Sequence, residues 1–123
     1  HNQPIYLKGI NFVSLCEHHL LPFTGLVNIA VYPNSKIAGV SKFSELVSVL
    51  SNSLTLQETL TKNIAIEIQN ALDPKGVMVK IRANHMCSSL LNIENFQTEF
   101  ETIYSTGIYE IDHTLRNEAL LNF

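Results

Sequence analysis

The sequence predicts an α+β fold in which an antiparallel β-sheet carries two helices on one face. β-rich apolar stretches lie towards both ends of the chain, and two stretches with helical apolar periodicity lie between them. The expected element order is therefore β-β-α-α-β-β. No internal repeat, low-complexity tract or linker interrupts the 123 residues, so we expect one domain that spans residues 1–123.

The first two strands are expected within residues 9–31, on either side of a chain reversal. Residues 10–15 are compatible with a strand, and residues 26–31 are rich in β-branched side chains. Residues 21–25 contain a proline and a glycine, which predicts the reversal there.

Two helices are predicted to follow. The first begins near Ser41 and has an apolar stripe at helical spacing, formed by Phe43, Leu46, Val47 and Leu50. The second begins at Thr55, because residues 55–58 fit the capping-box pattern of a threonine followed three residues later by a glutamate. Its apolar positions are Leu60, Ile64, Ile68 and Leu72, and residues 73–76 end it.

Two strands are predicted to complete the sheet. Residues 77–82 alternate in polarity, as in a half-buried strand, and this strand continues to Cys87. The last strand is expected across residues 98–110, with Gly107 as a bulge. Such a sheet has two open edges that neighbouring subunits would cover, so we expect a homo-oligomer.

The charge and hydropathy of the chain exclude several classes of partner. The formal net charge is −3 and the arginines are Arg82 and Arg116, so no basic face is available for a nucleic-acid backbone. No apolar run approaches the roughly 18 residues needed to span a membrane. A signal-peptide pattern is also absent, and we expect a soluble, cytoplasmic protein without nucleic-acid or membrane partners.

Both cysteines have histidine neighbours. Cys16 and His19 are spaced as C-x-x-H at the end of a predicted strand, and His85 stands two residues before Cys87. Zinc favours thiolate and imidazole ligands, so Cys16, His19 and Cys87 are candidate metal ligands. Three protein ligands leave one position open, as in catalytic zinc sites, where a bound water becomes a nucleophile near neutral pH. His18 and His85 remain as proton-transfer candidates.

Other interpretations of the same residues stay open at this point. A C-x-x-H spacing is a weak signal by itself, and a lone buried cysteine is usually a small apolar residue. In a secreted protein Cys16 and Cys87 would instead form a disulfide. Glu58 has a structural interpretation as the capping-box glutamate of the second helix.

Four motifs resemble those of the GTP cyclohydrolase I family, in the family's order and approximate spacing. They are FVSLCEHHLLPFTG at residues 12–25, GVSKF at 39–43, LQETLT at 56–61 and HMC at 85–87. The resemblance extends over about residues 9–109.

The resemblance implies the tunnelling fold (T-fold), in which subunits join their sheets into a barrel, typically as pentamers stacked into decamers, with active sites between subunits. It implies zinc bound by Cys16, His19 and Cys87, and acid–base roles for His18 and His85. It also places Glu58, with Gln57 beside it, at the amidine edge of a guanine-type ring, and Ser41 and Lys42 near the sugar and phosphate end of the substrate. A carboxylate suits the first role because it accepts two N–H bonds from such an edge.

Two positions depart from the family pattern. Glu45 and Leu91 stand where the family normally has arginines that bind the triphosphate. Exchanging an arginine for a glutamate near a polyanion changes the local charge by two, which at an effective dielectric near 20 involves about a few kcal/mol per contact.

We therefore expect a zinc-dependent hydrolase that acts on a purine- or pterin-type ring with little or no phosphate, by hydrolytic deamination or ring C–N hydrolysis. One alternative is an authentic GTP cyclohydrolase I that forms dihydroneopterin triphosphate and formate, with basic groups from a neighbouring subunit. An alternative of another class is a catalytically silent interaction subunit. A nitrile-reducing relative of the same fold ranks lower, because such enzymes lack the Cys-x-x-His and His-x-Cys pair.

Overall fold

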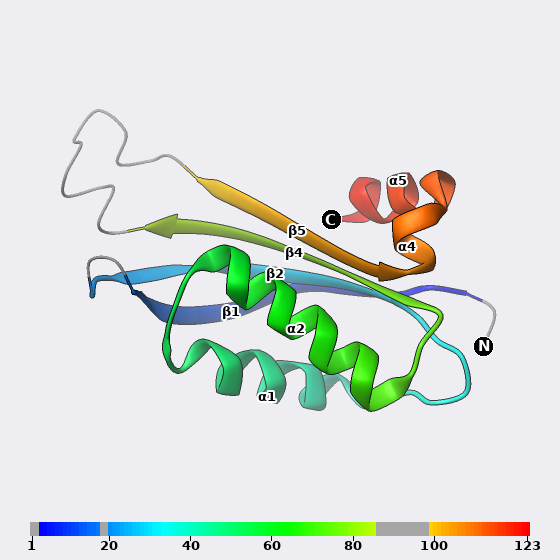
Figure 1. Ribbon diagram of the computed structural model, residues 1–123, viewed down its shortest axis with the longest axis horizontal. Helices are drawn as coiled ribbons and strands as arrows, with labels where there is room; N and C mark the ends of the chain where they lie inside the picture. Colours follow the sequence, from blue (N-terminus) through cyan, green and yellow to red (C-terminus); the bar gives the residue numbers. More distant parts are fainter. Residues whose placement is uncertain (1–2, 18–19, 86–98) are drawn as a thin grey trace.

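The computed structural model describes residues 3–17, 20–85 and 99–123. These residues form a five-stranded sheet of order β3-β1-β2-β4-β5 (Figure 1). All neighbouring strands are antiparallel except β1 and β3, which pair in parallel over two residues. The strands are β1 (Ile5–Cys16), β2 (Pro22–Tyr32), β3 (Leu54–Thr55), β4 (Gly76–His85) and β5 (Phe100–Gly107).

The two predicted helices cover one face of the sheet. Helix α1 (Val40–Ser51) packs on β1, and α2 (Gln57–Leu72) packs across β4 and β5. The stripe of α2 buries Leu60, Ile64 and Ile68 against the inward side chains of the strands. The predicted α+β class with two helices on one face is thus confirmed.

Two boundaries predicted in the first half of the chain differ from the structure. Pro22 to Gly25 lie within β2 rather than in the reversal, and a proline is compatible with the first position of a strand. Thr55 does not cap α2, because it pairs with Cys16 in the sheet and its hydroxyl donates to the carbonyl of Leu56. Helix α2 therefore begins two residues later, without a side-chain cap.

The C-terminal segment forms two helices that the sequence patterns did not predict. The prediction of a strand that continues to residue 110 with a bulge at Gly107 is wrong. Gly107 ends β5 with φ +58°, and α4 (Ile108–Ile111) and α5 (His113–Asn122) follow. They cover the other face of the sheet, where Tyr109 and Ala119 pack against Ala30 and Met78. Residues of β4 that were predicted to be half-buried are therefore buried on both faces in this region.

A β-bulge bends the first strand pair. The register of β1 against β2 shifts between Leu7 and Ile10, and Gly9 adopts φ +78° there. The backbone N–H of Gly9 donates to the side-chain oxygen of the buried Asn28 at 2.7 Å, which gives this buried amide a partner.

Among the described residues, no helix has both the length and the apolar composition needed to cross a membrane.

Candidate active site

Four predicted site residues, Cys16, Gln57, Glu58 and His85, lie at the same end of the sheet, where β1 and β4 end and α2 begins (Figure 1). Cys16 is the last residue of β1 and pairs with Thr55, two residues before α2. His85 is the last residue of β4, and its ring contacts the side chain of Gln57, the first residue of α2. The fold therefore brings Cys16, Gln57 and His85 together from distant parts of the sequence.

Two aromatic rings hold the imidazole of His85. Phe23, its cross-strand partner on β2, stacks on it with ring centroids 4.5 Å apart and planes inclined by 9°. Phe100 meets it edge to face at 5.0 Å. Burial lowers the pKa of His85, and the nearby charge of Glu58 opposes this with a smaller upward effect. The neutral ring is therefore favoured near pH 7.

Gln57 is buried, with 2% of its surface exposed, and its amide joins two strands. The Nε2 atom donates to the carbonyl oxygens of Ile81 on β4 (3.3 Å) and Phe100 on β5 (2.9 Å). It also donates to the hydroxyl of Thr102 at 3.1 Å. On the other side of the amide, Oε1 lies 2.7 Å from Nε2 of His85. Gln57 therefore has protein partners for both ends of its amide.

Glu58 stands beside Gln57 in the first turn of α2, and its side chain is exposed. A carboxylate at this position interacts favourably with the positive end of the helix dipole. It also lies close enough to His85 to act on its charge. This arrangement leaves the carboxylate exposed at the end of the sheet where the imidazole lies.

Cys16 is a buried free thiol at the point where β1 ends. Its backbone N–H donates to the carbonyl of Leu21, and its carbonyl accepts from the N–H of Leu20, which closes the turn towards β2. The other predicted ligands, His19 and Cys87, lie outside the described residues, as do His18 and Leu91. Residues 3–17, 20–85 and 99–123 contain no group of three or more acidic, histidine or cysteine side chains suited to a metal.

Ser41 and Lys42 are not near these residues in the same chain. They begin α1, which follows β2 and starts at the opposite end of the sheet (Figure 1). Lys42 lines a pocket with residues from the second half of α2, such as Glu67 and Ala71. Its Nζ lies 3.5 Å from the carboxylate of Glu45, in an exposed ion pair. The charge of Lys42 is thus partly balanced within its own helix.

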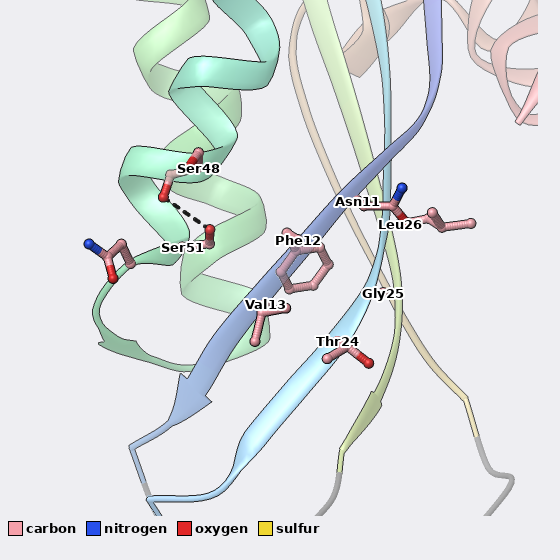
Figure 2. A pocket seen from close by; sticks show the side chains of 9 residues that line it. Asn11, Phe12, Val13, Thr24, Gly25, Leu26, Ser48 and Ser51 are labelled. Carbon is pink, nitrogen blue, oxygen red and sulfur yellow. Dashed lines mark hydrogen bonds between the residues drawn. The ribbon is translucent and has the colours of Figure 1, made fainter.

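A groove of about 730 Å³ lies between β1 and the end of α1 (Figure 2). Its polar side chains include Asn11, Thr24, Ser48, Ser51 and Asn52, and none of its lining residues is acidic, basic, a histidine or a cysteine. Among the described residues, its lining therefore offers no candidate metal ligand or acid–base group. It follows the edge of β1, which has β3 as a partner only at Leu15 and Cys16 among the described residues.

Sequence patterns did not reveal the aromatic and hydroxyl residues around His85 and Gln57. Phe23 appeared as part of a turn, whereas Phe100 and Thr102 lie more than 40 residues after Gln57 in the sequence. Strand register brings them together, and no local spacing encodes it.

The chain is similar over its whole length to one enzyme family. A family model described as GTP cyclohydrolase I matches residues 1–123. Proteins named GTP cyclohydrolase 1 from Rickettsia typhi (strain ATCC VR-144 / Wilmington), Rattus norvegicus and Homo sapiens are 44%, 39% and 38% identical over 97%, 98% and 98% of the chain. These alignments cover 62%, 50% and 48% of the relatives, so the chain spans about half to three-fifths of their length.

Two solved structures of low sequence identity support the predicted T-fold. The archaeosine synthase QueF-Like in the apo form superposes with a TM-score of 0.73 at 17% identity, covering 87% of this chain and 96% of that one. The dihydroneopterin aldolase of E. coli in complex with neopterin superposes with a TM-score of 0.66 at 8% identity, covering 85% and 99%. At these identities the likeness concerns the fold alone. The full-length match to the family model and the identity to its named relatives show that this chain belongs to the GTP cyclohydrolase I family.

Proposed function

We propose that this chain is a zinc-dependent hydrolase of C–N bonds in a purine- or pterin-type ring that carries little or no phosphate. The observation that carries the proposal is that Cys16, His85 and the first turn of α2, which contains Glu58, lie at one end of the sheet. The names of the relatives support the class of ring, since GTP contains a guanine.

Zinc fits the donor set that the sequence offers. Cys16 supplies a buried sulfur at the turn that leads to His18 and His19, and the strand that ends at His85 leads to Cys87. Cys16, His19 and Cys87 would hold the ion, because two thiolates and one imidazole suit zinc and leave an open position. When bound, zinc would supply Lewis-acid activation of the attacking water.

Glu58 would hold the substrate ring. Its exposed carboxylate at the start of α2 can accept two parallel N–H bonds from the amidine edge of a 2-amino-pyrimidinone. A ring held in this way would lie beside His85, which Glu58 already influences electrostatically. Glu58 would thus orient the substrate ring towards His85, the proton-transfer group.

His85 and His18 would move protons during the reaction. Water adds to an electron-poor ring carbon, the C–N bond breaks, and the departing nitrogen takes a proton from a histidine. His85 suits the step that removes a proton from water, because its lowered pKa keeps the ring neutral near pH 7. The returned proton completes the balance, so that water is consumed and either ammonia or a ring-opened amine is released.

The phosphate end of the site has lost positive charge relative to the family pattern. Glu45 and Leu91 replace two arginines, and Glu45 pairs with Lys42 at 3.5 Å. A triphosphate approaching Lys42 would therefore meet a carboxylate as well as an ammonium group. This favours substrates without the triphosphate.

A homo-oligomer, a pentamer or decamer, would complete the site. Ser41 and Lys42 lie at the end of the sheet opposite His85, so a neighbouring subunit would have to bring its own Ser41 and Lys42 to the substrate. The uncovered edge of β1, with the groove beside it, offers a surface where strands of two subunits can pair.

An authentic GTP cyclohydrolase I is the second candidate. Identities of 38–44% to proteins named GTP cyclohydrolase 1 favour it, and basic groups from neighbouring subunits would then replace the missing arginines.

The deciding experiment compares substrates with the zinc-loaded protein. GTP, dihydroneopterin and dihydropterin are incubated separately, and the products are identified by mass and by formate assay. Exchange of an amino group for oxygen on a pterin, with GTP unchanged, is the expected result. Robust formate release from GTP overturns the proposal in favour of the second candidate, and no turnover of any substrate favours an interaction subunit.

A further inference from the structure

The hydrogen bonds around Gln57 determine which way its amide faces. The hydroxyl of Thr61 donates to the backbone carbonyl of Gln57 at 2.7 Å. Since a hydroxyl has one hydrogen, the 2.7 Å contact between the hydroxyls of Thr61 and Thr102 requires Thr102 to donate. The oxygen of Thr102 then accepts from Gln57 Nε2.

The opposite orientation of the amide is unfavourable. It would direct Oε1 at the carbonyl oxygens of Ile81 and Phe100, which are acceptors and cannot donate. Oε1 would then face acceptors at both carbonyls, and the amide would lose two hydrogen bonds that are worth about 0.5–1.5 kcal/mol each. The network therefore keeps the NH₂ group towards the strands and Oε1 towards His85.

Oε1 accepts hydrogen bonds and cannot donate one. The 2.7 Å contact with His85 therefore requires that Nε2 of the imidazole carry a hydrogen. In the neutral ring the other nitrogen, Nδ1, is then unprotonated. The rings of Phe23 and Phe100 fix the plane of the imidazole, so that both its orientation and its tautomer are restricted.

We propose that Gln57 is a positioning residue that holds His85 in the Nε2–H tautomer, rather than a residue that contacts the substrate. The catalytic consequence rests on the proposed function: Nδ1 becomes the nitrogen through which His85 exchanges protons with substrate or water. A rotated or tautomerised ring would present the wrong nitrogen, which is a known way to lose acid–base catalysis.

Imidazole NMR tests the assignment without any substrate. The full chain is labelled with ¹⁵N-histidine, and the resonances of His85 are identified by their loss in His85→Asn. We expect a protonated Nε2 with a slowly exchanging, downfield hydrogen, and an unprotonated Nδ1. In Gln57→Met that hydrogen should exchange with water and its resonance should broaden or vanish. The matched control, Thr61→Val, changes the same network without touching His85 and should retain the resonance.

The outcomes divide the interpretations. A protonated Nδ1 in the wild-type protein overturns the proposal, and so does an unchanged His85 resonance in a folded Gln57→Met variant. If circular dichroism shows that the Gln57→Met variant is unfolded, the tautomer of His85 measured in the wild-type protein still tests the proposal. We expect Gln57→Met to lower kcat by about 10- to 100-fold at nearly constant KM for whichever substrate the protein turns over. The reason is that a misplaced His85 would lose part of its contribution to acid–base catalysis. A raised KM with unchanged kcat would indicate a substrate contact. Failure of the proposed substrate would leave the NMR result unaffected.

Discussion

The imidazole Nε2 of His85 lies 2.7 Å from the amide Oε1 of Gln57, although 28 residues separate them in the sequence. This contact joins the end of β4 to the first turn of α2, and the same amide reaches β5 through the carbonyl of Phe100. This end of the sheet is thus held by a polar network around the buried amide of Gln57. Glu58, the next residue along α2, is exposed beside this network.

Replacing Glu58 by glutamine tests its assignment as the ring anchor. The variant loses a charge-assisted hydrogen-bonded pair worth about 1.5–3 kcal/mol, so kcat/KM should fall by about 10- to 150-fold. The free energy of unfolding should change by at most about 1 kcal/mol, because the exposed carboxylate of Glu58 contributes to stability only through its interaction with the helix dipole. Glu67→Gln is a matched control on the exposed side of α2 and should retain full activity. Equal activity of both variants would assign Glu58 a structural role.

Replacing Cys16 by serine tests the metal assignment. Serine keeps the volume of the buried side chain but offers a poor zinc ligand, so the zinc content should fall from about one ion per chain to near zero. The content is measured by plasma mass spectrometry after dialysis. A chelator should likewise abolish activity of the wild-type protein, and added zinc should restore it. Full zinc occupancy in Cys16→Ser would exclude this cysteine as a ligand.

Replacing Glu45 by arginine tests whether this residue disfavours a substrate with a triphosphate. Glu45→Arg removes the ion pair with Lys42 and changes the local charge by two. We expect KM for GTP to fall by about 10- to 100-fold relative to that for guanosine, and the gain should shrink at high salt. Glu110→Arg makes the same exchange on α4, on the other face of the sheet from Lys42, and controls for the change in net charge. Equal gains in both variants would remove the special role of residue 45.

A charge on the open edge of β1 tests the assembly. Val13 is 62% exposed on this strand, and Val49 is 71% exposed on α1. If subunits pair through β1, Val13→Lys should shift the protein to smaller species, because a lysine on an edge strand disfavours pairing. Val49→Lys carries the same substitution on the helix and should leave the assembly intact. Light scattering after size-exclusion chromatography measures both masses, and an unchanged Val13→Lys oligomer would exclude this edge.

The buried Tyr109 should make the stability of the fold depend on pH in the alkaline range. Its phenol is fully buried, has no hydrogen-bond partner among the described residues, and burial raises its pKa, with smaller contributions from Tyr6 and Glu118. In the unfolded chain a tyrosine ionises near pH 10, so its contribution to stability is complete below about pH 10. Above that pH the unfolded state loses its proton first, and stability should fall by up to about 1.4 kcal/mol per pH unit.

Tyr109→Phe should remove this part of the alkaline loss. Urea unfolding at pH 8 and pH 11 measures the effect, and we expect a smaller difference between the two values in the variant. At pH 8 the variant should be as stable as the wild-type protein or more so, because it buries no unpaired hydroxyl. The raised pKa of Tyr6 adds a loss of the same sign, so some pH dependence should remain. Parallel curves for both proteins would contradict the assignment to Tyr109.

The sequence by itself determined the fold class and the two long helices. The apolar stripe of Leu60, Ile64 and Ile68 predicts α2 because burial of one helical face leaves a periodic record in the sequence. The motif around Cys16 and the one ending at Cys87 indicated the family, which the comparisons then established.

The tertiary structure alone decided how the site residues are arranged. It separates Ser41 from His85 by the length of the sheet, and it pairs Thr55 with Cys16 instead of leaving it to cap α2. It also surrounds Gln57 with acceptors from β4 and β5. These relationships depend on strand register and on which hydrogen-bond partners are buried together, and contacts between residues far apart in the chain leave no periodic pattern from which they could be predicted.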